Sequence, residues 1–291
     1  MLKKRITAIL PIKSGILVQS IAFNKYLPVG KPEIAVEFLN EWGIDEIIIL
    51  DITATLEGRT PDYDMIKRIS KKCFVPLTSG GGIKTIEEMR LLTHFGADKI
   101  AINSSALKNP GIIEKAAKVF GSQCVVVSID ARPVSTDSYE VYSNSGTIAT
   151  EKTPAEWARQ AENLGAGEIL INSISHDGQK KGYDINLIKA VSNTVSIPVI
   201  ALGGAGNPRH FLECAKETTA SSLAAGNFFH FTEHSPITLK AYLKQNNICV
   251  RLDTYADYNE LNFEEDTGRL KKLNETYFQK LRFEYHTEEI I

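Results

Sequence analysis

The sequence is poor in cysteine and has no long run of basic or of apolar residues. Its four cysteines are scattered, with no pair at C-x-x-C spacing, which favours reduced, packed thiols over disulfides or a zinc site. The formal net charge is −2 and no basic cluster stands out, so the electrostatic footprint of nucleic-acid binding is missing. No apolar stretch approaches the roughly 20 residues of a transmembrane helix, and the apolar part of the amino terminus is too short for a signal peptide. We therefore expect a cytoplasmic protein that binds neither nucleic acid nor membrane.

The histidines do not show the spacing of metal ligands either. His230 and His234 lie four residues apart, but Ser235 and Pro236 follow them, which argues against one regular helix that carries both. We expect no metal site and no cofactor.

The most informative stretch is residues 75–83, VPLTSGGGI, in which three glycines follow a short apolar run. Glycines at the carboxyl end of a strand let the backbone approach an anion, and the helical pattern that begins at Lys84 would direct N–H groups at the same place. We interpret this stretch as a phosphate site. A similar pattern recurs 122 residues later, at 197–206, and the same offset aligns residues 43–46 with 165–168. The shared offset indicates an internal duplication.

Strand-like apolar runs alternate with segments of helical period along the chain. The runs lie near residues 6–12, 46–51, 75–79, 98–103, 124–130, 168–174, 197–202 and 221–226. Segments of helical period lie between them at 34–42, 86–95, 110–120, 154–164 and 185–191. Continuous apolar strands indicate a parallel sheet buried on both faces, and eight such units predict an α/β fold, a (β/α)8 TIM barrel, over residues 1–252. An open, doubly wound sheet is the alternative, but the duplication favours a closed barrel.

Loops after the barrel strands are where chemistry is expected. The first and fifth, residues 11–31 and 130–150, are the longest and are candidates for mobile covers over a substrate. Residues 253–291, the C-terminal extension, contain ten acidic and five basic residues with interleaved aromatic side chains. We expect a helix at 269–285 that packs on the barrel, with a docking surface for another protein as the alternative.

Several motifs are together specific for one family. They are LDITA at 50–54, TSGGGI at 78–83, GADK at 96–99, GSQ at 121–123, DG at 177–178, GYD at 182–184 and GGAG at 203–206. With these motifs, residues 1–251 resemble the cyclase subunit of imidazole glycerol phosphate synthase, a histidine-biosynthesis barrel that receives ammonia from a glutaminase partner. The chain beyond Leu252 lies outside the resemblance.

The resemblance implies two phosphate sites and further substrate contacts on the loops. They are Gly82, Asn103 and Ser104 for one phosphate, Gly178, Gly204 and Gly226 for the other, and Asp51 and Asp177 beside them. Asp51 has a second interpretation, as an anchor of its own loop. Where the family offers a serine hydroxyl just before its Gly-Gly, this chain has Leu202, so the second site should hold phosphate more weakly.

The family's catalytic pair is altered here. Its two carboxylates end the first and fifth strands, and the fifth-strand partner is present as Asp130. The first-strand position is Pro11, which has no titratable group and cannot transfer a proton. Two neighbouring family residues are replaced by Ser14 and Gln19, whereas Lys13 is kept as a catalytic candidate.

At the opposite end of the barrel, the resemblance implies an ammonia gate of four charged residues. These are Arg5, Glu46, Lys99 and Glu168, and Asp98 corresponds to the family's contact with the glutaminase. Ion pairs that serve stability alone are the other interpretation, but all four charges at strand starts favour a gate.

Three functions fit these observations. The first is a cyclase-like barrel that docks a glutaminase and channels ammonia toward an acetamido sugar in surface-polysaccharide (O-antigen type) biosynthesis, together with a separate ATP-using amidotransferase. The second is the histidine-pathway cyclase itself. The third is a non-catalytic conduit and activator for that ATP-using protein. The substrate would be a phosphorylated small molecule or a nucleotide sugar. Pro11 argues against the second function, and the preserved gate fits the first and third equally.

Overall fold

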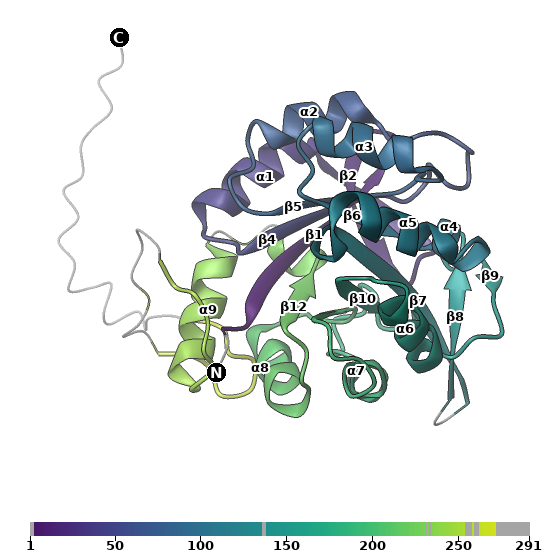
Figure 1. Ribbon diagram of the computed structural model, residues 1–291. Helices are drawn as coiled ribbons and strands as arrows, with labels where there is room; N and C mark the ends of the chain where they lie inside the picture. The colour runs from purple at the N-terminus through teal and green to yellow at the C-terminus, as the bar shows by residue number, and fades with distance from the viewer. Residues whose placement is uncertain are drawn as a thin grey trace, which may run out of the picture.

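The protein is a closed barrel of parallel strands surrounded by helices (Figure 1). The computed structural model describes residues 3–135, 138–230, 232, 234–253, 258 and 262–271. The barrel strands are β1 (Arg5–Lys13), β4 (Glu46–Asp51), β5 (Leu77–Gly80), β6 (Lys99–Ile102), β7 (Val125–Ser135), β10 (Glu168–Ser173), β11 (Val199–Leu202) and β12 (Ser222–Ala225). They pair in this order, and the pairings of β10 with β7 and of β12 with β1 close the sheet. The predicted TIM barrel is confirmed and the open sheet is wrong.

The helices form the outer layer (Figure 1). They are α1 (Pro32–Glu41), α2 (Tyr63–Ser70), α3 (Ile86–His94), the short α4 (Ser104–Lys108), α5 (Gly111–Phe120), α6 (Pro154–Asn163), α7 (Ile185–Ser192), α8 (Pro208–Glu217) and α9 (Ser235–Gln245). All five predicted segments of helical period are helices. Among the described residues, no helix is long and apolar enough to cross a membrane.

The strands are apolar on both faces because each lies between the helices and the barrel interior. Along β4, Ile47 and Ile49 belong to the outer core beneath the helices, whereas Ile48 belongs to the inner core. Successive side chains of a strand point to opposite faces, which explains why the sequence shows continuous apolar runs rather than alternation. The inner core consists of Ile9, Ile48, Ala101, Val126, Leu170, Ile200, Leu202 and Ala224.

The two long loops contain strands of their own. The first is a hairpin of β2 (Ile16–Ile21) and β3 (Lys25–Gly30), which pairs with β1. The fifth extends β7 into a meander with β8 (Ser138–Ser143) and β9 (Ile148–Ala149). Both loops therefore project from the barrel as hydrogen-bonded hairpins.

The described part of the C-terminal extension ends in a further hairpin, residues 262–271. An antiparallel bridge joins Phe263 to Leu270, and the Glu264 amide donates to the Arg269 carbonyl. The predicted helix therefore does not begin at Arg269, because residues 269–271 belong to this hairpin. The remainder of that prediction, residues 272–285, lies outside the described residues.

Lys240 of α9 ties this helix to the turn that precedes β4. Its side chain is buried, and its Nζ donates to the Gly43 carbonyl at 2.5 Å and to the Asp45 carboxylate at 2.7 Å. The Asp45 carboxylate also accepts from the Ile6 amide of β1 at 2.7 Å. Lys240 thus fixes the point at which β1 and β4 begin.

We expect Lys240→Ala to lower the free energy of unfolding by about 3–5 kcal/mol, because the Asp45 carboxylate stays buried without its cation. Lys244, an exposed lysine of the same helix, is the matched control, and Lys244→Ala should change the free energy by less than about 0.5 kcal/mol. Urea unfolding of both variants measures the difference. Equal effects would show that the Lys240–Asp45 pair contributes nothing beyond an ordinary surface charge.

Candidate functional site

A cavity opens at the carboxyl ends of the barrel strands, and all eight strand-following loops contribute to its lining. It brings together the residues that the sequence predicted for catalysis and binding, with one exception described below. These are Asp51, Gly82, Asn103, Ser104, Asp130, Asp177, Gly178, Gly204 and Gly226.

Asp130 lies deep in this cavity, between two amide side chains. Its carboxylate accepts from Asn103 Nδ2 at 2.8 Å and from Asn172 Nδ2 at 3.3 Å. Burial raises the pKa of Asp130 to about 7; the negative charge of Asp177 adds to the rise and the two amide donors oppose it. A carboxyl group that titrates near neutral pH is suited to proton transfer in either direction.

The sequence did not point to Asn172, although it stands beside Asp130 in the β7–β10 register. A polar residue at the carboxyl end of an otherwise apolar run, in EILINS, was the available signal.

The β1 side of the cavity has no carboxylate at the family's position. Pro11 lines the cavity there and stands beside Leu50 of β4 in the sheet. Lys13 is the exception among the predicted residues, because it lies outside the cavity lining and its Nζ sits 4.7 Å from the centroid of the Tyr26 ring. Tyr26, which the sequence did not suggest, does line the cavity.

The Tyr26 hydroxyl donates to the Phe23 carbonyl at 3.1 Å. Burial raises the pKa of Tyr26, and the charges of Asp177 and Asp130 raise it further. The ionisable group that faces the cavity from this side is therefore a neutral phenol.

The first predicted phosphate cluster, Gly82, Asn103 and Ser104, lies on one wall of the cavity. Gly82 has a positive φ of 74°, and a Cβ there would lie 2.7 Å from the Arg59 carbonyl oxygen, so the position requires glycine. Its amide donates to Thr55 Oγ1 at 3.3 Å.

The start of α3 offers this cluster fewer free amides than the sequence suggested. The helix begins at Ile86 rather than at Lys84, with Thr85 and Glu88 forming a capping box. The Glu88 carboxylate accepts from the amides of Lys84 and Thr85 at 2.6 and 2.9 Å. Two of the amides that precede the helix are therefore already occupied.

The second predicted cluster, Gly178, Gly204 and Gly226, lies across the cavity. A Cβ on Gly178 would lie 2.1 Å from the Ser20 carbonyl oxygen, and one on Gly204 would lie 1.9 Å from the Gly182 carbonyl oxygen. Glycine at both positions lets three loops pack closely around the mouth. Leu202 lines the cavity beneath them and offers no hydrogen bond.

Asp177 and Asp51 are both engaged with protein groups. The Asp177 carboxylate accepts from Ser20 Oγ at 2.5 Å, and burial raises its pKa. The Asp51 carboxylate accepts from the Thr53 and Ala54 amides at 3.0 Å and from Arg59 Nη1 at 3.1 Å. This geometry favours the interpretation of Asp51 as a loop anchor.

The two predicted covers meet above the cavity. Phe23, at the β2–β3 turn, packs on Gly146, where a Cβ would lie 2.9 Å from its ring. Two hydrogen bonds to other loops of the barrel fix the β8–β9 turn. The Asn144 amide donates to Ser104 Oγ at 2.9 Å, and Ser145 Oγ donates to the Ile52 carbonyl at 2.8 Å. Both long loops thus roof the cavity in this structure.

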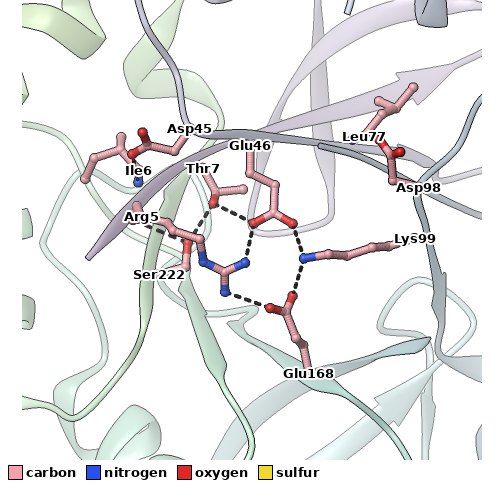
Figure 2. A network of polar contacts seen from close by, with 10 residues as sticks. All are labelled: Arg5, Ile6, Thr7, Asp45, Glu46, Leu77, Asp98, Lys99, Glu168 and Ser222. Atoms are coloured by element: carbon pink, nitrogen blue, oxygen red, sulfur yellow. Dashed lines mark hydrogen bonds and ion pairs between the residues drawn. The ribbon is translucent and has the colours of Figure 1, made fainter. Parts of the chain in front are cut away.

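At the other end of the barrel, four charged side chains form a closed ring (Figure 2). Each belongs to the first residue of a strand: Arg5 of β1, Glu46 of β4, Lys99 of β6 and Glu168 of β10. Arg5 contacts both carboxylates at 2.9 Å, and Lys99 contacts Glu46 at 2.7 Å and Glu168 at 3.0 Å. Each charge is thus paired with two of opposite sign, and we call these four residues the charge ring.

The charge ring is largely shielded from water. The side chains of Glu46 and Glu168 are 1% and 10% exposed. On the interior side, Thr7 Oγ1 lies 2.6 Å from Ser222 Oγ and donates to Glu46 at 3.4 Å (Figure 2).

Asp98 lies at the same end and is exposed. Its carboxylate accepts from the Leu77 amide at 2.8 Å, so it also fixes the start of β5 (Figure 2). Within the described residues, no three His, Cys, Asp or Glu side chains are grouped to hold a metal ion.

The pKa of Asp130 generates a prediction for stability. Since its folded-state pKa of about 7 exceeds the ordinary value of 3.8, the neutral carboxyl's contribution to stability is present at low pH and is lost as the pH rises through 7. Asp130→Asn stays neutral at every pH. Its free energy of unfolding relative to that of wild type should therefore rise by on the order of 1–3 kcal/mol between pH 5 and pH 8.

Urea unfolding of both proteins at the two pH values measures this gain, and the comparison cancels any constant loss of hydrogen bonding in the variant. The 13C shift of the Asp130 carboxyl should titrate with a midpoint near 7. A gain of zero together with a midpoint near 4 would contradict the prediction.

Comparison with known proteins gives a consistent result. Residues 5–235 match the family described as histidine biosynthesis protein. The imidazole glycerol phosphate synthase subunit HisF of Hydrogenobaculum sp. (strain Y04AAS1) is 49% identical over 252 residues, which cover 87% of this chain and 100% of that protein. The subunit of the same name from Bacillus cereus (strain G9842) is 46% identical over 252 residues, with the same coverage. The putative imidazole glycerol phosphate synthase subunit hisF2 of Vibrio vulnificus (strain YJ016) is 44% identical over 266 residues, covering 91% of this chain and 97% of that protein. The chain therefore belongs to the histidine biosynthesis protein family.

Proposed function

We propose that this chain is the ammonia-receiving barrel of a glutamine amidotransferase, and that its acceptor is not the histidine-pathway nucleotide. One observation carries the proposal. The charge ring is complete at one end of the barrel, while at the other end Asp130 shares the cavity with Pro11, which stands in place of the family's second carboxylate.

The interior between the two ends suits a neutral molecule. The charge ring opens onto the Thr7–Ser222 hydroxyl pair, and the inner core beyond it is apolar up to Leu202 in the cavity lining. Moving an unpaired ion through such surroundings costs several kcal/mol, whereas ammonia is small and uncharged. A swing of the Lys99 side chain would open the charge ring without disturbing the barrel strands.

The glutaminase would dock at the end that carries the charge ring and the exposed Asp98. Because the Asp98 carboxylate also binds the Leu77 amide, a docking test should use Asp98→Asn, which keeps an acceptor oxygen, beside a charge reversal.

The acceptor would bind in the barrel cavity. Glycine-rich loops let a phosphate group approach the backbone closely, which fits a phosphorylated small molecule or a nucleotide sugar. We propose an acetamido sugar of surface-polysaccharide biosynthesis, activated by a separate ATP-using amidotransferase. The choice of a sugar is supported by the family resemblance together with Pro11, and the names of the compared relatives do not add to it.

The second candidate function is the cyclase of imidazole glycerol phosphate synthase. Relatives at 46–49% identity bear that name, and Asp130 between two amides is suited to acid–base chemistry. Against it, the loss of one positioned acid–base group typically costs about 10²–10⁴ in rate. A non-catalytic conduit is the third candidate, for which the charge ring and the interior would suffice.

A cyclase assay separates the first two functions. Given the histidine-pathway nucleotide and ammonium, the chain should turn over about 10²–10⁴ more slowly than a HisF enzyme with both carboxylates. Pro11→Asp should restore part of the rate, and Pro11→Ser, which removes the proline without adding a carboxylate, should restore none. A wild-type rate close to that of the HisF enzyme would establish the second function instead.

Lys99→Ala tests the gate. In the complex with its glutaminase, this variant should release glutamate without an equal amount of aminated product, because the charge ring no longer closes. Lys118→Ala, which removes an exposed lysine paired with Glu114, is the matched control and should keep the ratio of the two products. Glutamate and aminated acceptor are measured in one reaction. An unchanged ratio for Lys99→Ala would mean that the charge ring is structural.

A further inference from the structure

The hairpin of residues 262–271 packs against the barrel through α8 and α9. The Phe263 ring lies 5.4 Å from the Tyr242 ring of α9. Gly268 passes directly over the same ring with a positive φ of 68°, and a Cβ there would lie 2.6 Å from Tyr242 Cζ. A substituent at Gly268 would therefore lift the hairpin from the barrel.

The hairpin also supplies partners to the first turn of α8, where helical amides lack intrahelical acceptors. The Arg209 amide donates to the Thr267 carbonyl at 3.1 Å. The Arg209 guanidinium reaches the carbonyls of Glu265 and Asp266 at 3.5 Å each. The position of α8 thus depends on a segment more than fifty residues away in the sequence.

Gly206 lies between α8 and the hairpin, and both its backbone amide and its carbonyl are hydrogen-bonded. Its amide donates to Nδ1 of His210 in α8 at 3.1 Å, and its carbonyl accepts from Nη2 of Arg269 in the hairpin at 3.3 Å. On a third side, a Cβ at Gly206 would lie 2.5 Å from Lys180 Cβ. The glycine is enclosed by three separate segments.

Gly206 lies in the loop that follows β11. The same loop contains Gly204 of the second predicted phosphate cluster. Gly203 and Gly204 both have φ of 101°, a conformation open mainly to glycine, so the loop has little conformational preference of its own. The Gly204 carbonyl accepts from the Gly182 amide at 2.9 Å. Contacts outside the loop must therefore fix its shape.

We propose that residues 262–271 act as a brace for the loop at 203–207, with Arg269 as the positioning residue that holds this loop ready to bind a phosphate group. The ligand part of this proposal rests on the proposed function, whereas the brace itself does not. The HisF relatives matched over their whole length cover 87% of this chain, and the hisF2 protein of Vibrio vulnificus covers 91%. The brace is thus an addition to a barrel of HisF length.

The test uses the full chain, inorganic phosphate as the probe, and amide signals that report on the two clusters separately. Arg269→Ala should weaken phosphate binding at Gly178, Gly204 and Gly226 about tenfold, as for loss of a hydrogen bond from a charged donor. Binding at Gly82 and Ser104 should be unchanged. Hydrogen exchange of the Gly182 amide should accelerate about tenfold, and Arg269→Lys should restore part of both effects.

Two further variants make the result specific. Gly268→Val keeps Arg269 but displaces the hairpin from Tyr242, and it should reproduce Arg269→Ala. Arg90→Ala removes an exposed guanidinium of α3 and should change neither readout.

Equally weakened phosphate binding at both clusters would show an effect of the lost positive charge and would overturn the brace. Unchanged hydrogen exchange of the Gly182 amide in both hairpin variants would overturn it as well. If wild type binds no phosphate at the second cluster, the proposed anion site fails. The hydrogen exchange of the Gly182 amide alone then decides whether residues 262–271 act as a brace.

Discussion

The structure depends on the pairing of four charges at one end of the barrel, where two buried carboxylates meet two partly buried cations. Glu46 is 1% exposed, and a carboxylate so shielded from water is costly unless cations lie beside it. Arg5 and Lys99 come from strands on either side of β4, and Glu168 completes the ring from β10. The four side chains meet because each begins its strand, and the parallel barrel brings these starts to one plane. Replacing such a ring by packed apolar residues is often neutral or stabilising, so stability alone is a weak reason for its presence.

The strand register that brings the charge ring together also brings the cavity residues together at the opposite end of the barrel. Asp130 and Asn172 are neighbours because β7 and β10 pair in parallel from Glu168 to Ser173. The apolar inner core separates the charge ring from the polar residues of the cavity. The two hairpins close the cavity from above, and the β8–β9 turn contacts Ser104 and Ile52 of the cavity lining.

The sequence predicted what the strands themselves determine. Their continuous apolar runs indicated a barrel, and the residues predicted for strand starts and ends lie at its two ends, with Lys13 outside the cavity lining as the exception. Tyr26 and Asn172 were missed because their positions depend on a hairpin fold and on strand register. The capping of α3 was also missed, because Glu88 reaches back to the amides of Lys84 and Thr85. The hairpin at 262–271 was beyond prediction, since its partners Tyr242 and Arg209 are distant in sequence.

The chemistry left to the cavity depends chiefly on Asp130, whose carboxyl has a pKa of about 7, whereas the Asp177 carboxylate is engaged with Ser20. Ring closure in the family uses an acid and a base on opposite walls, and here one wall offers Pro11 and the phenol of Tyr26, whose pKa is raised. Attack of ammonia on an acceptor that is already activated needs one base to remove a proton. Asp130, with a pKa of about 7, is partly ionised at neutral pH and can serve as that base. This arrangement supports the proposal of an acceptor that another protein activates.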